Sequence, residues 1–399
     1  MRFCLSLLIW LALACSLFAD EKPKPNTLTP KEMAEGWILM FDGETTFGWN
    51  AGDRLKLKEA SLVFDSTMDR KPGTTTAFGD VELAFRFFQT GAKDVNTRAA
   101  FTWGNHPMLR LVTLNAWVLG EVQAERNRLS ATFDFTDQND KSESSGKIKS
   151  NTTGRIQSDA ASPLQLEIPD GVSLSLHSIK IKPLGLKSVF NGKDLDGWKE
   201  HPGKKSKFSV TPEGWLHIKD GPGDLQTEAL YDDFILQIEC KTNGKQLNSG
   251  VFFRCRPGEY QQGYEAQIHN GFDADKPKEY VVEEYDPKTN ELKAKNKVKS
   301  PAVDYGTGGI YRRVPARKQA AKDGEWFTMT VIAHGRHIAT WVNGVQMVDW
   351  SDNRPLKDNA RNGCRLEKGA ISLQGHDPTT DLYFRNIRVA ELPKGAEKK

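Results

Sequence analysis

The chain has 399 residues, of which 38% are hydrophobic, and its formal net charge is +3. This length can supply two ordinary hydrophobic cores, and the near balance of charge gives no reason to expect a nucleic acid or another strongly charged partner. A lysine-rich stretch at 292–299 follows the acidic residues 281–286, so we interpret it as a solvated, mobile insertion and not as a phosphate-binding surface.

The first 19 residues, MRFCLSLLIWLALACSLFA, have the pattern of a secretory signal peptide: one arginine, an apolar run and then small residues. The run is too short for a membrane-spanning helix, and we predict cleavage after Ala19. Cys15 leaves lipoprotein anchoring open as an alternative. No other segment is long and apolar enough to cross a membrane, so we expect the mature chain to be exported, either periplasmic or secreted.

The chain repeats a motif. Residues 41–49 read FDGETTFGW and residues 190–198 read FNGKDLDGW, and the closing segments 176–184 and 384–392 resemble each other more loosely. Two copies of one module are therefore predicted, an accessory copy at 30–184 and a second copy at 187–392. The aromatic and glycine residues of the repeated turn are typical of packing and of turns, and less of ligand binding.

Glycine-rich turns, many Phe and Trp residues and few helical patterns predict an all-β chain. The segments 234–242 and 249–257 look like the two arms of a hairpin, which would bring Cys240 and Cys255 within disulfide reach. Two buried free thiols are the alternative. Cys364 has no obvious partner and is expected to be a small buried hydrophobe.

The most informative stretch is YEAQIHN at 264–270, which alternates apolar or small residues with polar ones as a half-buried strand does. Glu265, Gln267 and His269 would share one face of the strand. Each would lie roughly 7 Å from the next along it. Such a face can simply be solvated, but Glu, Gln and His are unusual choices for a strand surface, and together they suit a ligand.

Several regions of the second copy resemble one known family. SGVFFR, GYEAQIHN, GTGGIY, WFTMTVIAHGRHIATWVNG and ISLQGHDPTTDLYFRNIRVAEL are together similar to the 3-keto-disaccharide hydrolase domain family over about 188–392. The first copy resembles it only at its opening and closing strands. The resemblance implies two tandem concanavalin-like jelly-roll β-sandwiches. It also implies a carbohydrate substrate whose carbon 3 is a ketone, cleaved by hydrolysis or by elimination and hydration.

A 3-keto sugar does not need the paired carboxylates of ordinary glycosidases, because its ketone acidifies the proton at carbon 2 and one base can remove it. We therefore predict Glu265 and His269 as the catalytic candidates. The predicted substrate-binding residues are Arg254, Gln267, Asn270, Tyr311, Arg312, Gln374 and His376. Gln267 would hydrogen-bond a sugar hydroxyl, and Arg254 would stabilise the enolate or a carboxylate.

Other interpretations stay open. No cofactor is identified, but Glu265, His269 and Asp377 could gather a divalent metal that polarises the ketone. The chain could instead be a noncatalytic, lectin-like carbohydrate-binding module that uses tryptophans, or a purely structural tandem sandwich. The sequence does not indicate an oligomeric state.

Overall fold

The computed structural model describes residues 26–393 except 51, 53–54, 68–70, 92, 94–97, 104–105, 111–116, 126–127, 137–144 and 151–159. The predicted signal peptide at 1–19 lies outside the described residues. Within the described part of the chain, no helix has both the length and the apolar character needed to cross a membrane.

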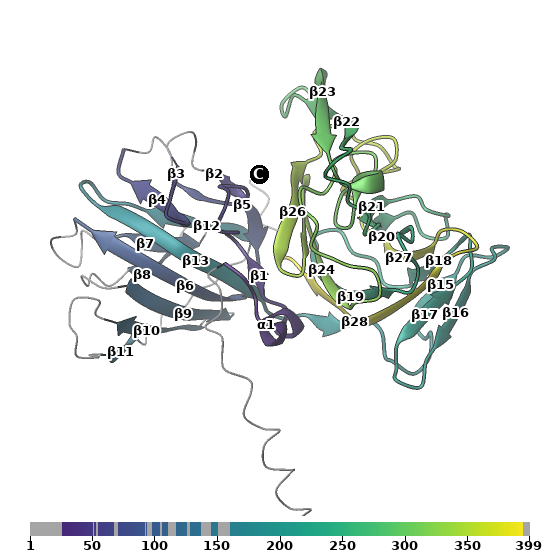
Figure 1. Cartoon of the computed structure of the whole chain (residues 1–399), viewed down its shortest axis with the longest axis horizontal. Coiled ribbons are helices and arrows are strands. Elements are labelled where there is room, and N and C mark those ends of the chain that lie inside the picture. Colours follow the sequence, from purple (N-terminus) through teal and green to yellow (C-terminus); the bar gives the residue numbers. More distant parts are fainter. Residues whose placement is uncertain are drawn as a thin grey trace, which may run out of the picture.

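The chain is almost entirely β, which confirms the predicted fold class, and it forms two sandwiches joined near residues 184–186 (Figure 1). The first sandwich follows helix α1 (Pro30–Glu35). Its strands are β1 (Ile38–Leu39), β2 (Trp49–Asn50), β3 (Lys56–Lys58), β4 (Ser61–Asp65), β5 (Gly73–Phe78), β6 (Val81–Thr90), β7 (Ala100–Trp103), β8 (His106–Arg110), β9 (Trp117–Glu125), β10 (Arg128–Thr136), β11 (Ser145–Ser150), β12 (Ser162–Glu167) and β13 (Ser173–Pro183).

The second sandwich contains a short 3₁₀ helix, η3 (Val303–Tyr305), and fifteen strands among its described residues. These are β14 (Lys187–Ser188), β15 (Trp198–Glu200), β16 (Lys207–Val210), β17 (Leu216–Lys219), β18 (Gly223–Thr227), β19 (Phe234–Thr242), β20 (Ser249–Cys255), β21 (Tyr264–Ile268), β22 (Lys278–Tyr285), β23 (Leu292–Ser300), β24 (Phe327–His334), β25 (His337–Val342), β26 (Val345–Ser351), β27 (Ala370–Gly375) and β28 (Asp381–Glu391).

The two sandwiches have the same strand order. In the first, one sheet runs β11-β10-β9-β6-β13-β4-β3 with β1 beside β13, and the other runs β2-β5-β12-β7-β8. The second repeats both paths as β26-β25-β24-β19-β28-β17-β16, with β14 beside β28, and β15-β18-β27-β20-β21. The repeat seen in the sequence at residues 41–49 and 190–198 therefore belongs to a complete duplication of topology.

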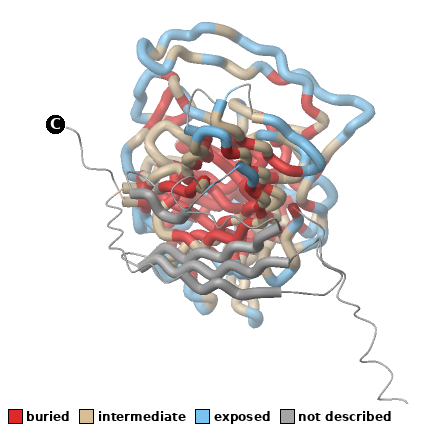
Figure 2. Tube along the Cα trace, turned by 90° about the vertical axis from the view of Figure 1, so that its left-hand side faces the viewer, coloured by how far each residue is buried: buried red, intermediate tan, exposed pale blue. Residues whose placement is uncertain are grey.

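The hairpin of β22 and β23 is an addition to this plan, because no strand pair stands between β8 and β9 in the described part of the first sandwich. It contains the lysine-rich stretch, and ion pairs cross it between Lys295 and Glu283 (3.3 Å) and between Lys297 and Glu279 (2.9 Å). Its residues are mostly exposed, and in Figure 2 it lies at the top, away from the buried interior. Cross-strand charge pairing explains how so polar a segment forms a hairpin.

The first sandwich packs against the outer face of the larger sheet of the second. Ile235, Ile332, Ala339 and Trp341, which point away from the second core, belong to the same buried apolar cluster as the core of the first sandwich. Trp341 Nε1 also donates to the carbonyl of Leu39 at 3.0 Å. We call this contact the inter-sandwich interface; it leaves that sheet covered on both faces.

Charged residues reinforce the interface. The carboxylate of Asp42, in the first repeated turn, pairs with Arg317 Nη1 at 2.7 Å and with Lys318 Nζ at 3.0 Å. Gln237 Nε2 donates at 2.7 Å to the carbonyl of Gly36, the left-handed residue that ends α1. A Cβ at Gly36 would lie 2.3 Å from Gln237 Oε1, so only glycine fits both the conformation and the contact.

The predicted hairpin carrying a Cys240–Cys255 disulfide is wrong. β19 and β20 follow each other along the chain but belong to different sheets, β19 pairing with β24 and β28 and β20 with β21 and β27. Consecutive strands of a sandwich often connect across the two layers, and the local sequence cannot distinguish this from a hairpin. Cys240, Cys255 and Cys364 are buried free thiols.

Candidate active site

Strand β21 places its side chains as its alternation predicts. Tyr264, Ala266 and Ile268 are buried in the core of the second sandwich. Glu265 and Gln267 therefore point to the opposite face of the smaller sheet, away from the core. Residues 309–311 lie against the free edge of β21. There Gln267 N donates to the carbonyl of Gly309, and Tyr311 N donates to that of Glu265.

A cavity of about 660 Å³ opens on this face. We call it the amide cavity because carboxamide side chains dominate its lining, which comprises Asn248, Tyr260, Gln261, Gln262, Glu265, Gln267, Tyr311, Arg312, Asn359, Arg361, Asn362, Gln374 and His376. Six predicted site residues come together here: Glu265, Gln267, Tyr311, Arg312, Gln374 and His376. His269, Asn270 and Arg254 are not among its lining residues.

Glu265 is the only carboxylate among the described residues that line the amide cavity. Its side chain is 4% exposed, and burial raises the pKa of its carboxyl to about 7, although Arg361 Nη2, 3.0 Å from Oε2, favours the ionised form. Gly250, opposite Gln267 on β20, makes room for it, because a Cβ there would lie 2.7 Å from Glu265 Oε1. The carboxyl can therefore exchange a proton near neutral pH.

Arg361 was not predicted from the sequence. It lies in the irregular segment after β26, and its guanidinium packs over the rings of Phe252 (5.0 Å) and Tyr311 (5.8 Å). Its Nε donates to the carbonyl of Gln261 at 3.2 Å. Phe252 pairs directly with Glu265 across β20 and β21, so the sheet register fixes the ring that supports the arginine.

Two buried amide oxygens in the cavity lack a hydrogen bond. Gln267 Nε2 donates to the carbonyl of Asp304 (2.8 Å) and to its Oδ2 (3.1 Å), which fixes the amide orientation and leaves Oε1 without a partner among the described residues. Gln374 Oε1, from β27, is in the same state. Buried acceptors without donors are rare and costly, so both oxygens suit the hydroxyl groups of a ligand.

His376 and Asp377 form a pair at the edge of the cavity. His376 Nδ1 lies 2.8 Å from Oδ2 of Asp377, and the Thr380 hydroxyl accepts from the backbone N–H of both residues. A carboxylate on Nδ1 fixes the neutral tautomer in which Nε2 is the unprotonated nitrogen. Within the described structure Nε2 makes no hydrogen bond, so this histidine has the geometry of an oriented base.

His269, a predicted catalytic residue, does not reach the amide cavity. β21 ends at Ile268, and the chain then turns so that His269 Nδ1 accepts from the N–H of Gly271 at 3.2 Å. Burial lowers the pKa of this histidine. Asn270 likewise serves the fold: its Oδ1 accepts from the Thr307 hydroxyl at 2.6 Å and its Nδ2 donates to Asp323 at 3.0 Å.

Arg254, the predicted enolate-binding residue, is fully buried and does not line the cavity. A register shift separates Phe252 from Cys255 along β27, and Arg254 takes a positive φ of 49° within it. The alternation of the strand fails at this bulge. The guanidinium instead donates to the carbonyls of residues 232, 335 and 365 and pairs with Asp233 at 2.9 Å.

Glu265, His269 and Asp377 do not form a cluster that could bind a metal ion. Across the described residues, no group of three His, Cys, Asp or Glu side chains is arranged to hold a metal ion. The corresponding strand of the first sandwich, β8, reads HPMLR and contains neither a carboxylate nor an amide. The first sandwich thus has no counterpart of Glu265 on this strand.

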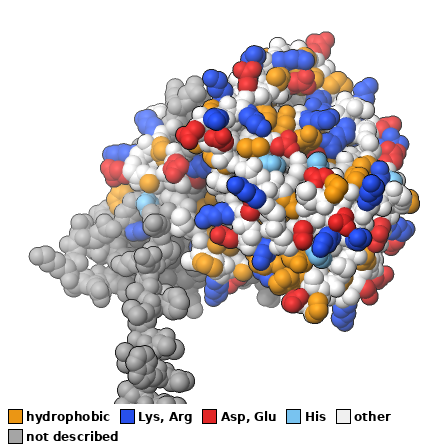
Figure 3. All heavy atoms as spheres, turned by 45° about the vertical axis from the view of Figure 1, so that its right-hand side comes forward, with side chains coloured by type: hydrophobic (Ala, Val, Ile, Leu, Met, Phe, Trp, Pro, Cys, Tyr) orange, Lys and Arg blue, Asp and Glu red, His pale blue; other side chains and the backbone are white. Residues whose placement is uncertain are grey.

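Charges of both signs are interspersed over the face that Figure 3 displays, and no single-sign patch covers it. The residues that converge on the amide cavity come from several elements: β21, β27, the loops before and after β20, the segment between β26 and β27, and the segment after η3. What they share is hydrogen-bonding capacity, with one titratable carboxyl and one oriented imidazole. This composition suits a small polyhydroxylated ligand.

The chain is similar to several known proteins over about half of its length. A curated 3-keto-disaccharide hydrolase from Bacteroides thetaiotaomicron is 28% identical over 239 residues, 52% of this chain and 79% of that protein. A solved structure of a proposed glycosyl hydrolase from Parabacteroides distasonis is 22% identical, with a TM-score of 0.39, over 52% of this chain and 94% of that one. The carbohydrate-binding module CBM66 from Bacillus subtilis is 14% identical, with a TM-score of 0.30, over 48% and 93%.

A family model, the 3-keto-alpha-glucoside-1,2-lyase-like domain, matches residues 185–390. The match begins with the second sandwich and ends in β28, its last strand, so it contains every residue that lines the amide cavity. It also covers more than half of the chain, and the chain therefore belongs to the 3-keto-alpha-glucoside-1,2-lyase-like domain family.

Proposed function

We propose that the chain is an exported carbohydrate-active enzyme, periplasmic or secreted, whose second sandwich cleaves the glycosidic bond of 3-keto glycosides. Membership of the family and the name of the Bacteroides relative support a glycoside hydrolase or lyase. The observation that carries the proposal is the buried carboxyl of Glu265, whose pKa is about 7, beside Arg361 and in one cavity with His376.

A single carboxyl is informative about the reaction. Ordinary glycosidases use two carboxylates on either side of the scissile bond, separated by about 5–10 Å. Among the described lining residues of the amide cavity, Glu265 has no second carboxylate as a partner. A sugar with a ketone at carbon 3 needs only a base for the proton at carbon 2 and an acid for the leaving oxygen.

The residues divide these roles as follows. Nε2 of His376 takes the proton from carbon 2, and the electron pair of that C–H bond is delocalised onto the ketone oxygen as an enolate. Collapse of the enolate forms the double bond between carbons 1 and 2. The bond from carbon 1 to the leaving oxygen breaks, its electrons stay on that oxygen, and Glu265 protonates it. The products are an alcohol and an unsaturated 3-keto sugar, and water added across the double bond gives the free 3-keto sugar.

Negative charge develops on the ketone oxygen as carbon 2 loses its proton, and a fixed cation nearby lowers the barrier. When Glu265 is protonated, Arg361 is no longer neutralised by it and can serve this oxygen. The unpaired amide oxygens of Gln267 and Gln374 would accept hydrogen bonds from the sugar hydroxyls. These contacts would hold the ring in place while the proton moves.

The test uses the full chain and the 3-keto form of a glucoside. Glu265→Gln and His376→Ala should each lower kcat by about 100- to 10,000-fold, the usual contribution of a general acid or base. His217→Ala is the matched control, because His217 also pairs with an aspartate, Asp381 at 2.9 Å, but lies outside the cavity. Full activity in both cavity variants would refute the assignment.

Heavy water separates the two chemical routes. Elimination followed by hydration places deuterium at carbon 2 of the sugar product, whereas direct hydrolysis does not. The alternative of a noncatalytic carbohydrate-binding module predicts binding of the 3-keto glucoside without turnover, and binding that survives in Glu265→Gln. That combination would replace the enzymatic proposal.

A further inference from the structure

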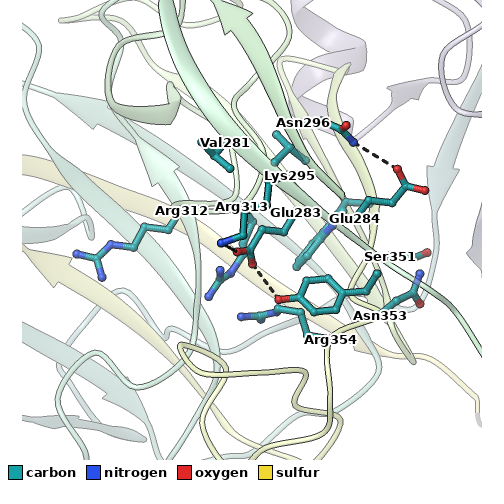
Figure 4. Close-up of a pocket in the computed structure, with 13 residues that line it drawn as sticks. Val281, Glu283, Glu284, Lys295, Asn296, Arg312, Arg313, Ser351, Asn353 and Arg354 are labelled. Atoms are coloured by element: carbon teal, nitrogen blue, oxygen red, sulfur yellow. Dashed lines mark hydrogen bonds and ion pairs between the residues drawn. The ribbon is translucent and has the colours of Figure 1, made fainter. Parts of the chain in front are cut away.

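A second cavity of about 650 Å³ lies between the β22–β23 hairpin and the end of β26. We call it the hairpin cavity. It is lined by Val281, Val282, Glu283, Glu284, Tyr285, Lys295, Asn296, Arg312, Arg313, Trp350, Ser351, Asn353 and Arg354, and Figure 4 shows ten of these residues labelled. The hairpin that forms one wall is the element that the second sandwich adds to the shared topology.

The hairpin cavity adjoins the amide cavity. Arg312 lines both, and its neighbours divide between them, Tyr311 lining the amide cavity and Arg313 the hairpin cavity. Arg313 Nη2 also donates at 2.7 Å to the carbonyl of Arg361, the residue that holds Glu265. Arg312 therefore lies at the boundary of the two spaces.

Apart from Arg312, the charged side chains of the hairpin cavity already have partners. Tyr285 donates to Glu283 at 3.0 Å, and Asn296 donates to Glu284 at 3.3 Å. Arg354 binds Asp352 through Nε (2.8 Å) and Nη2 (2.7 Å) and also donates to two carbonyls. The amide cavity differs, because the buried side-chain oxygens of Gln267 and Gln374 have no hydrogen-bond donor among the described residues.

Besides the side chains of Ser351 and Asn353, what remains available in the hairpin cavity is mainly apolar surface. Val281 is 46% exposed, and the half-buried rings of Tyr285 and Trp350 contribute to the lining. A second sugar would need free hydrogen-bonding partners here, whereas a flat apolar ring gains from contact with these side chains without them. The pairing of the polar groups thus favours an aromatic occupant.

Arg312 is the exception among the charged side chains of this cavity, because it is exposed and makes no hydrogen bond or ion pair with any described residue. Its guanidinium lies 5.4 Å from the Tyr311 ring, and in Figure 4 it extends away from Glu283 and Arg354. Its φ of 61° is uncommon for a residue other than glycine, and such strain often accompanies a functional role. The free cation stands at the boundary of the two cavities.

We propose that the hairpin cavity binds the leaving group of the substrate and that the leaving group it fits is a planar phenol, with the guanidinium of Arg312 donating to the oxygen that joins phenol and sugar. This inference rests on the proposed function of the amide cavity. The substrate class is then an aryl 3-keto glycoside, and the released product is a phenol. Arg312 would stabilise the charge that this oxygen acquires before it is protonated.

The experiment compares two substrates, the 3-keto form of a phenyl glucoside and that of a disaccharide, on the full chain. Val281→Asp introduces a charge into the apolar wall at a position exposed enough to leave folding intact. We expect kcat/KM for the phenyl substrate to fall at least about tenfold, mainly through KM, and that for the disaccharide to change less than about twofold. Val298→Asp is the matched control, on the same hairpin and exposed but outside the cavity.

An equal or larger loss with the disaccharide would assign the cavity to a second sugar and overturn the proposal, and no loss with either substrate would do the same. If the chain turns over neither substrate, the proposed function fails, and direct binding of phenol then decides for the hairpin cavity. Tryptophan fluorescence should report phenol binding in the parent chain and in Val298→Asp but not in Val281→Asp. Any other pattern refutes the inference.

Discussion

The buried carboxyl of Glu265 should make the stability of the protein depend on pH, and Glu265→Gln should remove that dependence. The folded-state pKa of about 7 lies above the ordinary value of 4.5, so the folded protein holds this proton more tightly than the unfolded chain. The stabilisation is complete below pH 4.5 and is lost as the pH rises through 7. Glutamine mimics the protonated carboxyl at every pH.

The magnitude follows from the difference in pKa. Each pKa unit corresponds to about 1.4 kcal/mol, so ionisation of Glu265 lowers the free energy of unfolding by about 1 kcal/mol at pH 5 and about 3 kcal/mol at pH 7 and above. Glu265→Gln should therefore be more stable than the parent chain by about 1 kcal/mol at pH 5 and by about 3 kcal/mol at pH 8–9. The variant should thus gain stability at neutral and alkaline pH while it loses activity.

Urea denaturation followed by tryptophan fluorescence at five values between pH 5 and pH 9 measures this difference. Other groups that titrate in the same range contribute equally to both proteins and cancel. His217→Ala, whose histidine lies outside the amide cavity, serves as the comparison. Parallel stability curves for Glu265→Gln and the parent chain would show that burial does not raise the carboxyl's pKa, and the proposed acid would lose its physical basis.

Three further predictions follow from the packing. Gly250→Ala should lower kcat about 10- to 100-fold, because its Cβ would displace the Glu265 carboxyl, whereas Gly244→Ala, whose Cβ meets nothing closer than 3.4 Å, should be nearly silent. Asp42→Asn should lower the free energy of unfolding by about 3 kcal/mol, because it removes the buried carboxylate that pairs with Arg317 and Lys318 and leaves Arg317 without an ion pair; Glu44→Gln, at an exposed carboxylate, should lower it by less than about 1 kcal/mol in urea denaturation. The described cysteines should resist a thiol reagent in the folded protein, as site-resolved mass spectrometry can establish, because burial raises the pKa of each.

The sequence predicts those parts of this protein that depend on local patterns. The alternation of residues 264–268 correctly places Glu265 and Gln267 opposite the core, because a strand has a fixed period of two. The same rule fails for Arg254, where a bulge interrupts the period, and for His269, which lies one residue beyond the end of its strand. The alternation predicts the direction of a side chain only within a regular strand, and not at a bulge or beyond the end of the strand.

Contacts between distant segments are beyond such patterns. Arg361 lies in a polar loop with no periodicity, and only the fold brings it to Glu265, 96 residues earlier in the chain. The false hairpin around Cys240 and Cys255 has the same origin, since strand order along the chain does not determine which sheet a strand joins. The repeated turns, in contrast, indicated the duplication because both copies kept the same packing residues.

The inter-sandwich interface has a consequence for how the chain holds together. Trp341 and its neighbours are as deeply buried as the core residues of the first sandwich. Separating the two halves would therefore expose apolar surface on both. If a protease cut the connection at residues 184–186, the halves should remain associated as complementing fragments and elute together in size-exclusion chromatography. We therefore expect the duplicated modules to unfold together as one cooperative unit.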